Sequence, residues 1–254
     1  MFLDTVKIKK HLIEFIRQEF TETGFHKGIV GLSGGVDSAL VAYLAAEALG
    51  RDNVLAILMP YKTSSPDSIM DAREIVKILG IKSEIIDITP MVDAYIAMAG
   101  EIGNVRKGNI MARQRMIVLY DISARDHGLV IGTSNKTEIL LGYGTLYGDT
   151  ACALNPIGDL YKTQVWQLAE AVGVPQKIIQ KQPTADLWSG QTDEGELGFS
   201  YREIDRLLYA MINLGESDEK LISSGYDQKF INKVREMISR NEFKRRPPRI
   251  AKIS

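Results

Sequence analysis

Eight consecutive residues near the N-terminus have the types and spacing of an anion-binding turn. They are Gly31, Leu32, Ser33, Gly34, Gly35, Val36, Asp37 and Ser38. A strand-like apolar run precedes them at 28–30, and a helix-like run follows them at 39–49. Glycines that take positive φ let backbone N–H groups approach an oxyanion, and the helix N-terminus adds a partial positive charge. The stretch therefore predicts a phosphate-binding turn, with two serine hydroxyls beside the amides.

Asp37 is unusual in a phosphate-binding loop. The loop is not a Walker A sequence, which places a lysine on the phosphates. A carboxylate beside phosphates is repulsive unless a cation lies between them, so the loop implies Mg²⁺. The alternative is a tight turn without a ligand, since glycine and serine are ordinary turn residues. The two glycines alone would favour that alternative, whereas the full set of eight residues favours phosphate.

A second turn from strand to helix begins at Gly132. Thr133 can bond a nucleotide hydroxyl or phosphate, and Glu138 lies early on the following helix. Taken alone, the stretch fits an ordinary helix N-cap with an acid near the dipole. With Asp37 at an adjacent strand end, Glu138 predicts an oxygen-rich Mg²⁺ site, because magnesium takes one or two carboxylates together with phosphates and water.

Asn109 and Arg113 lie four residues apart on the longest helical stretch, 105–127, and so share a face. They would offer an amide and a forked cation to an anionic substrate. A solvated polar stripe explains them about as well. The same stretch is too apolar for one buried face, which predicts packing on both sides and a twin subunit on one of them.

The elements that must position these residues alternate along the chain. Strands are predicted at 28–30, 54–59, 83–88 and 129–132. Helices are predicted at 6–20, 39–49, 65–79, 91–99, 105–127 and 161–172. This alternation predicts an α/β three-layer sandwich with a mainly parallel, doubly wound sheet. After residue 174 the pattern indicates a helical C-terminal third with one long polar connection, 182–198.

Ligands of an open parallel sheet bind at the carboxyl ends of its strands, where the strand order reverses. The loops at Ser33, Pro60 and Thr133 should therefore converge on one site. With 254 residues and no linker composition, the chain is expected to form a single domain over 1–254. Within 182–198, Asp193 and Glu194 are predicted to be solvated charges.

Composition excludes several classes of protein. The formal net charge of −1 gives no electrostatic case for nucleic acid or an anionic membrane. No apolar run is long enough to cross a bilayer. The one cysteine, Cys152, cannot form an intrachain disulfide, so a cytoplasmic location is the simplest expectation. His11, His26 and His127 lie away from the motifs, which leaves no Ser-His-Asp candidate.

The loop at 31–38 resembles the pyrophosphate-binding loop of the N-type ATP pyrophosphatases, within the adenine nucleotide α-hydrolase-like superfamily. From about 28 to about 244 the chain resembles the ammonia-dependent NAD⁺ synthetases. The resemblance implies that Thr133 contacts ATP and that Glu138 holds Mg²⁺ with Asp37. It places Lys162, in the stretch 155–162, on the ATP phosphates, and Thr184, at the start of a mobile loop, on ATP. Asp37 and Lys162 are then the expected catalytic residues.

The resemblance also implies a binding site for deamido-NAD⁺. Arg113, with Asn109 beside it, falls where the family has an arginine that grips this substrate, and Lys244 matches a family lysine. The loop 141–149 matches incompletely. Leu146 and Ala153 stand where many members have a lysine and an aspartate, so neither is assigned a contact, and Asp149 is left open.

The activity implied is ATP-dependent amidation of deamido-NAD⁺ by ammonia through an adenylated carboxylate, with release of AMP and pyrophosphate. The family also implies a homodimer, and the chain shows no glutaminase segment ahead of its first strand. Two alternatives remain open. One is another N-type ATP pyrophosphatase that amidates a different acceptor, and the other is a sensor that binds ATP without turning it over.

Overall fold

The computed structural model describes residues 3–184, 186–188 and 191–253. These residues form a four-stranded sheet in the order β3-β2-β1-β4. The strands are β1 (Lys27–Gly31), β2 (Val54–Leu58), β3 (Lys82–Ile85) and β4 (Gly128–Ile131). Every strand pair is parallel, and β1 lies in the middle, with Ile29 opposite Leu55 of β2 and Val130 of β4. The predicted parallel sheet is therefore confirmed.

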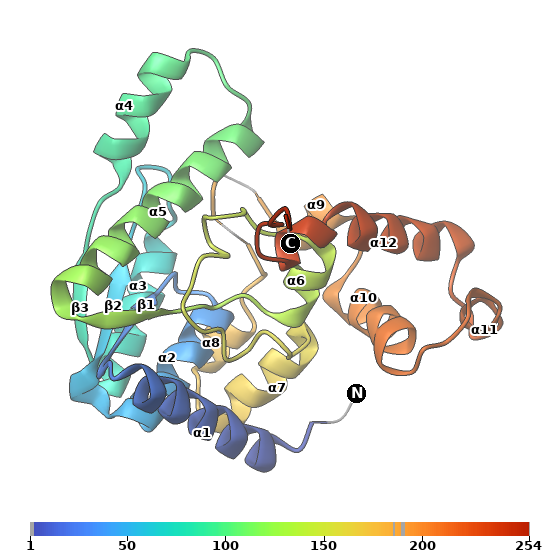
Figure 1. Ribbon diagram of the computed structural model, residues 1–254, viewed down its shortest axis with the longest axis horizontal. Coiled ribbons are helices and arrows are strands. Elements are labelled where there is room, and N and C mark those ends of the chain that lie inside the picture. Colours follow the sequence, from blue (N-terminus) through green and yellow to red (C-terminus); the bar gives the residue numbers. More distant parts are fainter. Residues whose placement is uncertain (1–2, 185, 189–190, 254) are drawn as a thin grey trace.

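Helices cover both faces of the sheet, as Figure 1 shows. One face carries α1 (Thr5–Thr23), α2 (Val36–Leu49), α3 (Pro66–Leu79) and α7 (Lys162–Val172). The other face carries α4 (Thr89–Ala99) and α5 (Asn104–Asp126). This is the predicted three-layer α/β sandwich. Among the described residues, no helix is long and apolar enough to cross a membrane.

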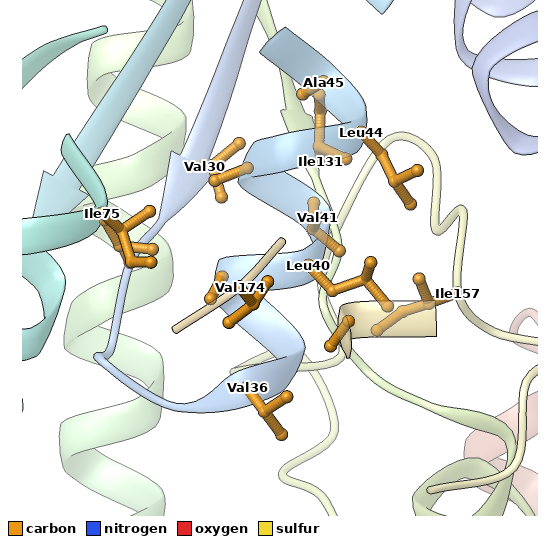
Figure 2. Packing of buried hydrophobic residues seen from close by; sticks show 14 of the residues in the cluster. Val30, Val36, Leu40, Val41, Leu44, Ala45, Ile75, Ile131, Ile157 and Val174 are labelled. Carbon is orange, nitrogen blue, oxygen red and sulfur yellow. The ribbon is translucent and has the colours of Figure 1, made fainter. Parts of the chain in front are cut away.

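The larger core lies between β1, β4 and the first helical layer. Figure 2 shows Leu40, Val41 and Leu44 of α2 packed among side chains such as Val30 and Ile131 of the sheet. A helix that is apolar on most of its circumference is buried on several sides, and α2 is covered by the sheet, α1 and α7. Because α2 is held so firmly, the loop that leads into it has a fixed position.

The C-terminal third is helical and has a hydrophobic core of its own. Its elements are α8 (Gln176–Ile179), α9 (Asp193–Leu197), α10 (Tyr201–Leu208), the π-helical turn Tyr209–Asn213, α11 (Asp218–Ser223), α12 (Gln228–Arg240) and the 3₁₀ turn Glu242–Arg245. In Figure 1, α10, α11 and α12 project to one side of the sheet. Their buried side chains pack with Leu141 of α6 (Lys136–Leu141) and with Tyr161, just before α7.

Two differences from expectation bear on the site. The helix expected at 39–49 begins at Val36, so Asp37 lies in its first turn, because Gly35 already provides an extended N-cap. The connection expected at 182–198 contains α9. Leu197 of α9 is buried in the C-terminal core, so the segment predicted as a polar connection contributes to a hydrophobic core. Helix α9 contains three acidic residues and one leucine, so its sequence shows no apolar pattern that would predict burial.

Candidate active site

A cavity of about 780 Å³ lies at the carboxyl edge of the sheet. The loops after β1, β2 and β4 line it at Ser33, Pro60 and Thr133, and α5 forms a long wall. The predicted convergence of these three loops is confirmed. Sites of this size hold small organic ligands, and the position beside the central strand is where a parallel sheet binds them.

The turn after β1 depends on one glycine with a positive φ angle, which other residues rarely adopt. Gly34 has φ +84°, and a Cβ atom there would lie 2.1 Å from the backbone oxygen of Ser68. Gly35 has φ −90° and is the extended N-cap of α2. Both glycines were expected to be able to take positive φ, and only Gly34 does so. Its lack of a side chain lets the turn lie directly against the start of α3.

The two serine hydroxyls hold the turn together. The backbone N–H of Ser33 donates to Ser38 Oγ at 3.2 Å, and Ser38 Oγ donates to the carbonyl of Gly35 at 3.1 Å. Ser33 Oγ accepts from the N–H of Gly35 at 3.2 Å and lies 3.0 Å from Ser38 Oγ. Both hydroxyls thus shape the turn in addition to any contact they make with a ligand.

Asp37 and Lys162 form a buried ion pair beside this turn. Lys162 Nζ donates to Asp37 Oδ2, and the lysine is only 3% exposed although it comes from the start of α7. Asp37 Oδ1 accepts from Asn135 Nδ2 at 3.0 Å. Burial alone would lower the pKa of Lys162, but the carboxylates of Asp37 and Glu138 raise it above its ordinary value. The lysine is therefore a charged group held at the edge of the turn.

Glu138 is fixed by a capping box at the start of α6. Asn135 Oδ1 accepts from the N–H of Glu138, and Glu138 Oε2 accepts from the N–H of Asn135, each at 3.1 Å. Burial and the charge of Asp37 together raise the pKa of Glu138 well above its ordinary value. Asp37 and Glu138 are thus close enough to repel each other, which a divalent cation would relieve.

The two carboxylates of Asp37 and Glu138 suit Mg²⁺, which needs few protein ligands, better than they suit a metal ion whose ligands all come from the protein. In the described part of the chain, no three His, Cys, Asp or Glu residues are grouped to hold an ion. Magnesium commonly takes one or two carboxylates and completes its octahedron with phosphates and water. Asp37 and Glu138 would supply the protein oxygens of such a site.

Asp193 was expected to be a solvated charge, and this prediction is wrong. The residue is 5% exposed, and its carboxylate accepts from the hydroxyls of Tyr201 at 3.0 Å and Tyr143 at 3.2 Å. Burial raises its pKa, and the charge of Lys162 lowers it, so Asp193 lies within electrostatic reach of that lysine. The Tyr201 ring completes the group, with Lys162 Nζ 5.2 Å from its centroid. Helix α9, within the segment predicted as a polar connection, thus places the carboxylate of Asp193 near Lys162.

Asn135 was missed by the sequence reasoning, although it is fully buried and joins Asp37 to the capping box of Glu138. Its signal was available, because an asparagine three residues before a glutamate is typical of a capping box.

The residues expected to bind deamido-NAD⁺ divide between the cavity and its rim. Asn109 lines the cavity and accepts from Thr145 Oγ1 at 2.7 Å. Lys244 lines it as well, with Nζ donating to the carbonyls of Gly142 at 2.7 Å and Gly144 at 2.9 Å. Burial lowers the pKa of Lys244, and the charge of Asp149 opposes this.

Arg113 lies on the exposed side of α5, where Nε and Nη2 donate to the carbonyl of Leu146 at 3.3 and 3.2 Å. Its contact with substrate stays a prediction. Arg115 is the arginine of this helix that lines the cavity, and Nε donates to the carbonyl of Met59 at 3.1 Å. Helical spacing carries the signal that was missed, since Ala112, Arg115 and Leu119 recur on the cavity face.

The described part of the segment 182–198 forms another wall of the cavity. Asp186 Oδ2 accepts from the N–H of Ser65 at 2.9 Å, just before α3. Leu187 lies against Gly108 of α5, where a Cβ atom would be 2.8 Å from a leucine methyl group. Thr184 Oγ1 accepts from the N–H of Asp186 at 3.0 Å at the base of the segment. Ser189 and Gly190 of this segment lie outside the described residues.

A parallel α/β sheet with a glycine and serine turn, a buried lysine and paired carboxylates at its carboxyl edge is the arrangement with which α/β proteins hold anionic ligands. Comparison with known proteins narrows this class. The NAD synthase family profile matches residues 8–248, and the chain belongs to that family. It is accordingly a ligase of NAD biosynthesis.

Three relatives illustrate the match. The NH₃-dependent NAD⁺ synthetase of Trichlorobacter lovleyi is 55% identical over 252 residues, which cover 99% of this chain and 92% of that protein. The structure of the Campylobacter jejuni NH₃-dependent NAD synthetase is 38% identical, with a TM-score of 0.85 over 99% of this chain and 100% of that one. An NMN synthetase structure from Francisella tularensis is 31% identical, with a TM-score of 0.88 over 98% of this chain and 99% of that one.

Proposed function

We propose that the protein amidates deamido-NAD⁺ with ammonia, using ATP to activate the nicotinate carboxylate. The observation that carries this proposal is the group formed by Asp37, Glu138 and Lys162 beside the phosphate turn, the first residues of which line a cavity of about 780 Å³. A carboxylate needs activation because its leaving group would be oxide. In the first step, a carboxylate oxygen attacks the α-phosphorus of ATP, and the bond from phosphorus to pyrophosphate breaks. Ammonia then attacks the acyl carbon, AMP leaves with the bonding electrons, and the nitrogen loses a proton.

The residues on the phosphate side would act by positioning and by charge. The N–H groups of 31–38 and the N-terminus of α2 would bind the β- and γ-phosphates that depart. Lys162 would turn from Asp37 to a phosphate oxygen, and Thr133 and Thr184 would contact ATP. When bound between Asp37 and Glu138, Mg²⁺ would neutralise phosphate charge. The reaction requires no nucleophilic side chain.

The deamido-NAD⁺ side would use the rest of the cavity. Asn109 and Lys244 line it, Arg113 holds the loop at its rim through Leu146, and Arg115 adds a half-buried cation on the cavity face. An arginine and a lysine suit an acceptor that carries phosphate groups.

The solved NMN synthetase favours a mononucleotide acceptor as the second candidate, since that protein covers nearly the whole chain. Leu146 and Ala153, which replace a lysine and an aspartate of the family pattern, leave room for a different acceptor in this region. Both candidates use the same chemistry and differ only in the length of the acceptor.

Exchange of labelled pyrophosphate into ATP tests the activation step and the acceptor together. We expect exchange that depends on deamido-NAD⁺ and is absent with ATP alone, because the carboxylate must attack before pyrophosphate can leave. Nicotinate mononucleotide, the matched shorter acceptor, should support it poorly. Stronger exchange with the mononucleotide would transfer the assignment to the second candidate. If neither acceptor supports exchange, a sensor that binds ATP without turning it over would be the better explanation.

Free ammonia is the expected nitrogen source. Ammonium chloride at neutral pH should support NAD⁺ formation, whereas glutamine in an ammonia-free preparation without a partner protein should support none. The physical reason is that release of ammonia from glutamine needs a nucleophile, and the single cysteine, Cys152, has its thiol pKa raised by burial. Chromatographic measurement of NAD⁺ distinguishes the two cases, and efficient turnover with glutamine would contradict the proposal.

We also expect a homodimer formed through α5. Val105 and Ile117 on this helix are 71% and 50% exposed, and Tyr120 is exposed nearby. Sedimentation equilibrium at micromolar concentration should give twice the chain mass of 28.3 kDa. Ile117→Glu should shift the protein to the monomer, while the same change at exposed Ile222 of α11 should not. A fully active monomer would refute the expectation.

The segment 182–198 is expected to act as a lid over the adenylate, because this intermediate must be kept from water until ammonia arrives. Its contacts to α3 and α5 through Asp186 and Leu187 describe a docked arrangement. Limited proteolysis within it should be fast in the free protein and several-fold slower with ATP, Mg²⁺ and deamido-NAD⁺. Cleavage after the exposed C-terminal Arg249 is the internal control. Equal rates in the two states would leave only a floppy loop.

A further inference from the structure

Helix α7 begins at Lys162. Its Gln164 Oε1 accepts from the N–H of the N-cap residue at 3.0 Å, but this leaves the first N–H groups of the helix itself uncapped. Its N-cap residue is Tyr161, whose hydroxyl bonds Asn213 at 2.7 Å and makes no cap hydrogen bond. The first N–H groups of a helix have no partner within it and need acceptors from elsewhere. In this protein they find them on other helices. The N–H of Lys162 donates to Thr137 Oγ1 at 3.1 Å, and the N–H of Thr163 donates to Asp205 Oδ2 at 2.7 Å.

Asp205 joins three helices through one carboxylate. It lies on α10, is 0% exposed, and its Oδ1 accepts from Thr137 Oγ1 at 2.5 Å. Thr137 is fully buried as well and immediately precedes Glu138 on α6. The hydroxyl of Thr137 therefore donates to Asp205 while it accepts from the start of α7. Through these two residues, the backbone beside Glu138 is fixed relative to the backbone that carries Lys162.

Capping a helix with a buried carboxylate costs desolvation free energy. Ile204, Leu207 and Leu208, which surround Asp205 in sequence, all belong to the apolar core of the C-terminal third. Burial raises the pKa of Asp205, and the hydrogen bonds from Thr137 and Thr163 oppose this. Serine or asparagine would cap α7 without the cost of burying a charge. A carboxylate has two acceptor oxygens, and Asp205 uses them to bind one donor from α6, the Thr137 hydroxyl, and one from α7, the N–H of Thr163.

We propose that Asp205 is a positioning residue that aligns Lys162 with Glu138 for the phosphates of ATP. It touches neither substrate nor metal and acts only through the starts of α6 and α7. The inference rests on the proposed function, because it takes Lys162 to be a phosphate-binding group.

The test compares ATP affinity in two backgrounds. Calorimetric titration with Mg²⁺ and ATP, in the absence of deamido-NAD⁺, measures binding without turnover. In the parent protein, Asp205→Asn should weaken ATP roughly tenfold, because its amide NH₂ would face Thr137 Oγ1 and displace the hydrogen bond that now aligns α6 with α7. Thr137→Val, a milder change of similar volume, should have the same effect. In the Lys162→Ala background, Asp205→Asn should weaken ATP by clearly less than in the parent protein, since one of the two groups that it aligns is gone.

Two controls separate positioning from stability. Thr137→Ser retains the hydroxyl and should keep ATP affinity within about twofold of the parent. Asp227 caps α12 through the N–H groups of Lys229 and Phe230, so Asp227→Ala removes a capping side chain in the same helical third. That variant should lower the melting temperature and leave ATP affinity unchanged.

Each remaining outcome is decisive. Equal losses of ATP affinity from Asp205→Asn in both backgrounds, or a fall in melting temperature alone, would show that Asp205 only stabilises the fold. If Lys162→Ala by itself binds ATP normally, the proposed role of Lys162 fails, and the positioning role fails with it. Failure of the proposed role of Lys162 is therefore detected in the single Lys162→Ala variant, and it is distinguished from failure of the positioning role of Asp205, which only the Asp205 variants reveal.

Discussion

Asp37→Asn and Glu138→Gln should each lower turnover by roughly a hundredfold or more while the protein stays folded. Each substitution keeps the shape of the side chain and removes one of the two negative charges proposed to share Mg²⁺ with the phosphates. Asp37→Ala and Glu138→Ala should lose at least as much. Release of pyrophosphate at saturating ATP measures the effect, and circular dichroism reports whether the fold is retained.

The affinity for Mg²⁺ gives a second measure of the same hypothesis. If the two carboxylates hold the ion, both variants should need more magnesium to reach half of their maximal rate. Asp52→Asn, on an exposed residue outside the site, is the matched control and should behave as the parent. Near-normal turnover of either site variant at ordinary magnesium concentration would show that the metal site is misassigned.

Gly34→Ala should be far more damaging than Gly35→Ala, although the two glycines are neighbours. At Gly34 the added methyl group would meet the Ser68 backbone oxygen at 2.1 Å, and φ of +84° is itself unfavourable for alanine. We expect a loss of roughly 3 kcal/mol in the free energy of unfolding. Because the turn must shift to relieve the contact, kcat/KM for ATP should fall by roughly a hundredfold.

Gly35→Ala serves as the matched control. Its φ of −90° is ordinary, and the nearest atom to an added methyl group is Ser33 Oγ at 3.4 Å. The free energy of unfolding should change by no more than about 0.5 kcal/mol. Urea denaturation of the two variants side by side measures the difference. Equal destabilisation would contradict the conformation described for this turn.

The fold was largely predictable because its signals are local. Apolar runs bounded by glycine or proline located the strands and helices, and their alternation indicated a parallel sheet. The edge strand β3 is shorter than predicted, Lys82–Ile85 rather than 83–88. Beyond it, Ile86 and Ile88 still donate their backbone N–H groups to the carbonyls of Leu58 and Pro60, which explains why the apolar pattern continues past the end of the strand. The helix α9 was missed because five largely acidic residues carry little periodic signal.

The site residues were predictable only where the whole pattern lies within one short stretch of sequence. The turn at 31–38 and the capping box at Glu138 are local patterns. Asp193 and Asp205 are not, because each acquires its role through contacts with residues 50 or 68 positions away. Neither burial nor partner can be read from an acidic residue in a polar stretch. Arg115 is a different case, because two arginines two residues apart on a helix face nearly opposite directions, and the helical spacing of Ala112, Arg115 and Leu119 indicates which of them meets the cavity.

The capping box of α6 has a consequence for conformational entropy. A glutamate that binds a ligand ordinarily loses about 1.5–2 kcal/mol of rotamer freedom when it does so. Glu138 has already lost that freedom on folding, because Oε2 is held by the N–H of Asn135 at 3.1 Å and the asparagine is itself held by Asp37. The carboxylate therefore meets an incoming ligand in a single conformation, and the entropy of its side chain no longer opposes binding.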